Sequence, residues 1–169
     1  MELIPYLVAE LDRETQKSRH ALEQVPADRR GWKPHDRSME FGYLADMVAT
    51  IPSWIAMILN QDELDIAPKD GKKPTSDPMT TSDAYIKALD GAAKTARAAL
   101  AGTTVEHLHT NWKLLAGGQV VSDTTRLEFL SDTINHWVHH RGQMTVYLRL
   151  MGAKVPALYG PSADDKSFG

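Results

Sequence analysis

The sequence predicts an all-α protein, a four-helix bundle with a long crossover between helices three and four. Four segments repeat their apolar residues every three to four positions, which places those residues on one face of an α-helix. Stretches rich in proline, glycine and polar residues separate the segments and interrupt any helix there. Helices that each bury one face are expected to pack lengthwise around a shared core.

The first two helices are predicted on either side of a proline-containing connector. We expect the first helix from Glu2 to Gln24 and a connector over residues 26–38. The second helix contains Pro52, which lacks an amide hydrogen and is expected to kink the helix near Val48. The apolar residues that define the buried face of this helix are Tyr43, Leu44, Met47, Val48, Ile51, Trp54, Ile55 and Ile58.

Two long stretches separate the remaining helices. Residues 60–80 are the most polar and proline-rich part of the chain, so we expect a surface loop there. The third helix should run from about Thr81 to Ala101. The crossover covers residues 102–125, in which WKLLAGGQVV can form a short hairpin across its glycine pair. The fourth helix should run from about Thr125 to Met151, and its apolar residues on all sides make it the helix least exposed to water.

Length and composition narrow the classes of protein. The chain has 169 residues, which suits one domain over residues 1–169. Its 19 Lys+Arg and 22 Asp+Glu residues nearly balance, so we expect no nucleic-acid partner. Because there is no cysteine, a transition metal would need His, Asp or Glu ligands. No stretch approaches the ~20 apolar residues of a membrane span, so we expect a cytoplasmic protein with no membrane partner.

The candidate chemistry lies on the fourth predicted helix, in INHWVHHRGQMTVYLRLMGA (residues 134–153). His136 and His140 are four residues apart, so they share one helix face with their β-carbons about 5–6 Å apart. Neutral imidazoles so placed can bind one zinc, nickel, copper or iron ion. Asp132, one turn earlier, can hydrogen-bond an imidazole and orient it. His139 is expected to point to the other side of the pair.

The same pair has a second interpretation, in which the histidines are hydrogen-bonded residues of a buried helix and bind no metal. A catalytic zinc ion uses about three protein ligands and keeps one position open for water. His136 and His140 supply only two.

The chain resembles the DinB-like superfamily in two segments. HWVHHRGQMTVYLRLMGAKVPALYGPSADD (residues 136–165) is similar to its C-terminal part, in which H-x-x-x-H-R-G-Q lies on the last helix. WKPHDRSMEFGYLADMVATIPSW (residues 32–54) is similar to its second-helix region. The resemblance implies a four-helix bundle, often a homodimer, with divalent zinc or nickel in a cleft between helices. Members of known activity use that metal to activate a low-molecular-weight thiol for transfer or isomerisation.

One position departs from the pattern of that family. The resemblance implies metal ligands at His136 and His140 and a third histidine on the second helix, where this sequence has Met47. Shifting to the neighbouring Asp46 would turn the ligand by about 100° around the helix. A thioether is a poor ligand for zinc or nickel, so Met47 is expected to pack with its apolar neighbours. A third ligand would then come from water, from substrate or from another residue, for which the candidates are His20, His35 and Asp46.

Two functions follow from these observations. One is a metal-dependent enzyme of the thiol transferase or hydrolase type, with an incomplete site of His136 and His140 that binds zinc or nickel weakly or not at all because of Met47. The other is a non-catalytic homodimeric bundle that binds a small ligand or acts as an interaction module. A serine hydrolase and a phosphate-loop enzyme are not indicated, because the sequence has neither a G-x-S-x-G elbow nor a glycine-rich loop that ends in lysine.

Overall fold

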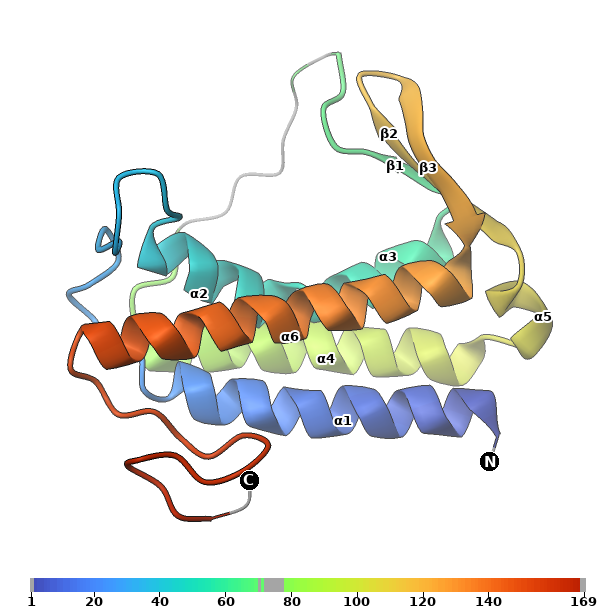
Figure 1. The fold of residues 1–169 in the computed structure, drawn as a ribbon. Helices are drawn as coiled ribbons and strands as arrows, with labels where there is room; N and C mark the ends of the chain where they lie inside the picture. The colour runs from blue at the N-terminus through green and yellow to red at the C-terminus, as the bar shows by residue number, and fades with distance from the viewer. Residues whose placement is uncertain (1, 70, 72–77, 168–169) are drawn as a thin grey trace.

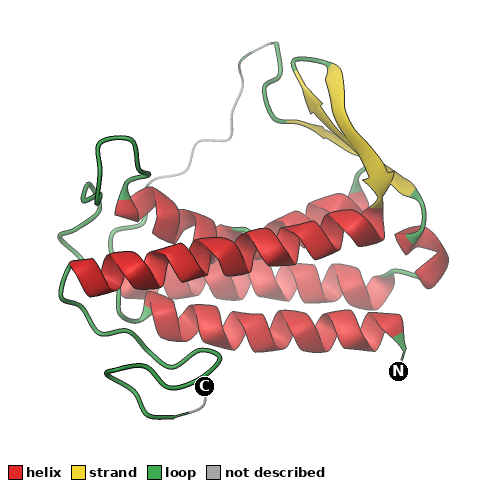
Figure 2. Ribbon diagram, in the orientation of Figure 1, coloured by secondary structure: helices red, strands yellow, loops and turns green. Residues whose placement is uncertain are grey.

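The protein is mostly helical and carries one small sheet (Figures 1 and 2). The computed structural model describes residues 2–69, 71 and 78–167. The elements in these residues are α1 (Leu3–Leu22), α2 (Phe41–Thr50), α3 (Pro52–Asn60), β1 (Glu63–Asp65), α4 (Ser82–Gly102), α5 (Val105–Leu108), β2 (Asn111–Ala116), β3 (Gln119–Thr125) and α6 (Arg126–Leu150).

The long helices begin and end close to the predicted positions. In Figure 1, α1, α4, α6 and the consecutive pair α2–α3 lie lengthwise beside one another around a shared apolar core. Local sequence sets where α6 begins: the Thr125 hydroxyl accepts from the Glu128 amide, and the Glu128 carboxylate accepts from the Thr125 amide. This capping box satisfies two amides that the first helical turn leaves unpaired. The last helix is therefore fixed at its N-terminus, about three turns before the histidines.

The predicted second helix is broken rather than kinked near Val48. It ends at Thr50, and Pro52 begins a separate helix, α3, which is bent from α2 by 49°. Because proline has no amide hydrogen, the Val48 carbonyl four residues earlier loses its helical donor. The Trp137 indole of α6 replaces that donor, with 2.8 Å from Nε1 to the carbonyl oxygen. The proline break thus creates the acceptor that holds α6 against α2.

The predicted fold class is confirmed in part: the protein is mostly helical, but a mixed three-stranded sheet, which the all-α prediction lacks, stands at one end of the helices (Figure 2). The hairpin expected in the crossover is confirmed: β2 and β3 pair antiparallel, and Gly117 and Gly118 both have positive φ, as this turn requires. The third strand, β1, pairs parallel to β2 and lies in residues predicted as a surface loop. Residues 70 and 72–77 of that predicted loop lie outside the described residues.

Polar side chains attach this sheet to the helices. Arg126, the first residue of α6, is 2% exposed. Its guanidinium donates to the carbonyls of Ile58, Gln61 and Asn111 at 3.0, 3.0 and 2.6 Å. The Asp65 carboxylate of β1 accepts from the Gly117 and Gly118 amides at 3.0 and 2.7 Å. The end of α3, the sheet and the start of α6 are therefore held as one unit.

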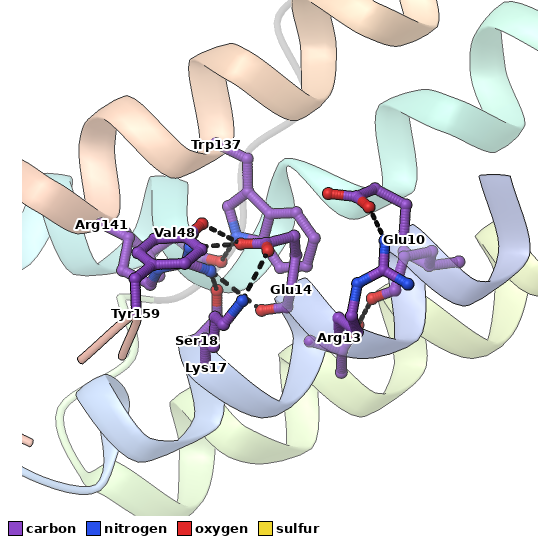
Figure 3. A network of polar contacts seen from close by, with 11 residues as sticks. Glu10, Arg13, Glu14, Lys17, Ser18, Val48, Trp137, Arg141 and Tyr159 are labelled. Atoms are coloured by element: carbon purple, nitrogen blue, oxygen red, sulfur yellow. Dashed lines mark hydrogen bonds and ion pairs between the residues drawn. The ribbon is translucent and has the colours of Figure 1, made fainter. Parts of the chain in front are cut away.

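A buried ion pair fixes α6 against α1 (Figure 3). Arg141 and Glu14 are 0% and 2% exposed, and the Arg141 guanidinium binds the Glu14 carboxylate and donates to the Glu14 carbonyl and the Ser18 hydroxyl, both at 3.0 Å. The Tyr159 hydroxyl, from the C-terminal segment, donates to the same carboxylate at 2.6 Å. Burial acts to raise the pKa of Glu14, but the hydrogen bonds from Tyr159 and Arg141 outweigh it and lower the pKa. Burial and the bond to Glu14 raise the pKa of Tyr159 to about 12.

Within the described residues, no single helix is both long enough and apolar enough to cross a membrane. The bent pair α2–α3 meets that requirement by length and composition only.

Replacing Arg141 with methionine should destabilise the fold strongly. The change leaves the Glu14 carboxylate buried without its cation, and breaking a buried pair in this way costs about 3–5 kcal/mol in free energy of unfolding. Urea denaturation at neutral pH measures the loss. The control is Arg97→Met, whose exposed partner Asp12 makes a surface pair worth at most about 1 kcal/mol. Equal losses in the two variants would show that the buried pair does not stabilise the fold.

Candidate site at the histidine pair of α6

The two predicted histidines lie together on α6. The Nε2 atoms of His136 and His140 are 2.7 Å apart, which is a hydrogen-bond distance. His140 is 4% exposed and His136 is half-buried, with its ring centroid 5.4 Å from that of Trp54 on α3. The helical spacing therefore brings both imidazoles to a single point, as the sequence predicts. His139 is exposed and lies outside this contact.

Gln143 determines which ring nitrogens carry protons. Its amide oxygen lies 2.8 Å from His140 Nδ1 and can only accept, so that Nδ1 carries the hydrogen. The Nε2 of neutral His140 then has a free lone pair and accepts from His136 Nε2–H. The Nδ1 of His136 is left as an acceptor. Burial and the nearby charges of His140 and His139 lower the pKa of His136, which favours the neutral form of His136.

Asp132 does not orient the histidines in the way the sequence suggests. Its side chain is exposed, and no hydrogen bond joins it to either imidazole among the described contacts. The partners that hold the pair are Gln143 and the ring of Trp54.

The expected third-ligand positions do not complete a metal site. Met47 is partly buried and packs against the apolar core. Asp46 lies in an ion pair with Arg30, whose nitrogens are 3.1 and 2.9 Å from its two carboxylate oxygens. His20 and His35 are exposed on other parts of the molecule. In the part of the chain that the structure describes, no three His, Asp or Glu side chains are grouped to hold a metal ion. Among the described residues, the histidine pair therefore offers two nitrogen atoms to a metal ion, and no third His, Asp or Glu side chain is grouped with them.

An apolar cleft of about 480 Å³, which we call the aromatic cleft, adjoins His136. It lies between α3, the sheet and the first half of α6, where the Trp112 and Phe129 rings meet edge to face at 4.7 Å. The residues that line it are Trp54, Met57, Ile58, Leu64, Ile66, Trp112, Leu114, Phe129, Asp132, Thr133 and His136. Sequence reasoning missed this cleft, because it assigned Trp54 to the core and gave no partner to the apolar residues of β1 and β2. The alternating Trp112 and Leu114 of the predicted hairpin were the available signal.

The fold and the site define a mostly helical protein whose last helix presents a histidine pair at the end of an apolar cleft. The chain belongs to the DinB family, whose model matches residues 3–167.

Solved relatives share this fold. The crystal structure of a DinB-like protein from Bacillus cereus ATCC 10987 has a TM-score of 0.69 at 21% identity and covers 90% of this chain and 95% of that one. The DinB-like protein YjoA from Bacillus subtilis has a TM-score of 0.68 at 19% identity and covers 95% and 99%. The uncharacterized protein YrdA of Bacillus subtilis strain 168 is 46% identical over 48 residues, which span 28% of this chain and only 27% of YrdA.

The His136 imidazole should titrate below its ordinary pKa of 6.5, because burial and its histidine neighbours disfavour the charged form. Unfolding restores the ordinary pKa, so the stability that the neutral form provides is complete above pH ~6.5 and falls as the pH drops through the lowered pKa of the folded state. NMR titration of the imidazole signals measures the midpoint. His140→Gln removes one neighbouring charge and should move the midpoint up. A wild-type midpoint at or above pH ~6.5 would contradict this reading.

Proposed function

We propose that this DinB family protein binds a small, largely apolar molecule in the aromatic cleft, with the histidine pair as the polar end of the binding site. The observation that carries the proposal is the position of His136, whose ring packs on Trp54 and forms part of the cleft lining. A cleft of this volume, with many apolar groups and a few convergent polar ones, is typical of small-molecule sites.

The bent pair α2–α3 has a place in this proposal. Counted as one broken helix, it makes the long helices a four-helix bundle, and the break turns α3 toward the sheet. The cleft then lies between α3 and the sheet, and it depends on both the helices and the extra strands. This is the non-catalytic, ligand-binding alternative that the sequence raises.

A metal-dependent enzyme is the second candidate. Two observations favour it: the Nε2 atoms of His136 and His140 converge, and Gln143 holds the other nitrogen of His140 as metal-binding histidines are commonly held. A divalent ion would act as a Lewis acid and lower the pKa of a bound water or thiol. Because the described residues offer no third ligand beside the pair, we expect this candidate to bind zinc or nickel only weakly.

A neutral probe, 2-(1-naphthyl)ethanol, should bind the wild-type protein and shift the indole N–H signals of Trp54 and Trp112 in NMR spectra. Met57 is half-buried in the cleft lining, so Met57→Trp should fill the cleft and weaken binding at least tenfold. The control Val146→Trp adds the same indole on the outer face of α6, where Val146 is 57% exposed, and should bind like wild type. Failure of the wild-type protein to bind this probe or charged analogues with the same ring system would end this proposal.

Replacing Met47 with histidine tests the metal candidate. Met47 precedes Val48, whose carbonyl accepts from Trp137, so the substituted side chain would lie beside the α6 turn that carries the pair. A third imidazole should raise zinc or nickel affinity at least tenfold at neutral pH, which is ~1.4 kcal/mol. The gain should fade as the histidines protonate near pH ~6.5. Competitive metal titration measures it, with His140→Ala as the control. Equal affinities in folded wild type and variant would show that position 47 does not face the pair.

A further inference from the structure

We propose that the ligand of the aromatic cleft is a ring-bearing amine, whose apolar rings fill the cleft and whose protonated nitrogen lies at its polar end. This inference rests on the proposed function and adds the chemical class of the ligand.

A relay of hydrogen bonds makes the polar end an acceptor. Gln143 Oε1 accepts from His140 Nδ1–H, and His140 Nε2 accepts from His136 Nε2–H. The relay runs in one direction only, because an amide oxygen cannot donate. It ends at His136 Nδ1, which carries a lone pair and makes no hydrogen bond within the described part of the chain. A group that binds there must donate a hydrogen.

The same end of the cleft carries a negative charge. Asp132 lies one helical turn before His136 and, among the residues that the structure describes, is the only formally charged one in the cleft lining. No cation from residues 2–69, 71 or 78–167 forms an ion pair with it. A ligand carboxylate would be repelled by Asp132 and would find no donor on His136. An ammonium group suits both, because it carries positive charge and has only hydrogens to donate.

The remaining residues of the cleft favour a ligand whose apolar part is an aromatic ring system. Trp54, Trp112 and Phe129 present aromatic surface, and aliphatic side chains from α3, β1 and β2 complete the walls. Flat rings pack well against such surfaces in stacked or edge-to-face geometry. Trp54 also contacts the His136 ring, so an ammonium held there lies close to an indole face, which attracts cations.

Three probes that share one naphthalene ring system and differ in their polar group test the inference. They are 2-(1-naphthyl)ethylamine, 2-(1-naphthyl)ethanol and 1-naphthaleneacetate, which are positive, neutral and negative at pH 7.5. Calorimetric titration should give at least tenfold tighter binding of the amine than of the acetate, with the alcohol between them. The Trp54 and Trp112 indole signals should report the same site for each probe, and the Trp32 signal should not move.

Two variants test whether the preference for the amine comes from the charge of Asp132 and not from a general change in the protein. Asp132→Asn, at an exposed position, should remove the preference for the amine, so that the amine binds with about the affinity of the alcohol. The control Asp36→Asn removes the same charge from the exposed connector before α2 and should keep the preference for the amine. Equal affinities for the three probes, or tighter binding of the acetate, would overturn the inference while the proposed function stands. No binding of any probe would overturn both.

Discussion

The buried ion pair between Arg141 and Glu14 is the constraint on which the site depends most. A guanidinium with 0% exposure needs hydrogen-bond acceptors for its donors, and here a carboxylate, a carbonyl and two hydroxyls supply them. This requirement allows α6 one rotation against α1. Because His140 directly precedes Arg141 in the helix, the same rotation directs the histidine pair away from α1. The need to pair the buried Arg141 charge on one face of α6 thus determines the direction in which the histidines on another face point.

The second contact that positions α6 arises from a defect in its neighbour. Pro52 leaves the Val48 carbonyl without a helical donor, and an unpaired carbonyl in a core position is costly. The Trp137 indole supplies the donor. One side chain therefore packs in the core and also pairs the carbonyl that the helix break leaves free. Trp137 directly follows His136, and its position sets the place of that histidine along the helix axis. The Arg141–Glu14 ion pair fixes the rotation of α6, and the Trp137–Val48 hydrogen bond fixes its position along the helix axis. Together they place the histidine pair.

The sequence predicts those features whose causes lie close together along the chain. The limits of α1, α4 and α6 follow from apolar periodicity, with threonine caps at the starts of α4 and α6. The β2–β3 turn follows from Gly117 and Gly118, which tolerate positive φ. The convergence of His136 and His140 follows from helical spacing alone. Strand β1 escaped prediction because it is three residues long and pairs with a strand distant in sequence. The sequence leaves Asp46 open as a metal ligand, because nothing near it in the chain indicates that Arg30 binds its carboxylate. The aromatic cleft exists only once α3, the sheet and α6 are assembled.

The histidine pair shows why two converging imidazoles do not by themselves define a metal centre. A metal ion needs a lone pair from each ligand nitrogen, whereas the observed contact uses a hydrogen of one imidazole and a lone pair of the other. Metal binding by both Nε2 atoms therefore requires His136 to move its hydrogen to Nδ1. That change would give up the bond between the rings and turn His136 Nδ1 from an acceptor into a donor. The ligand-binding function and the metal-dependent function thus correspond to opposite hydrogen-bonding characters of one atom, Nδ1 of His136, a residue that lines the aromatic cleft.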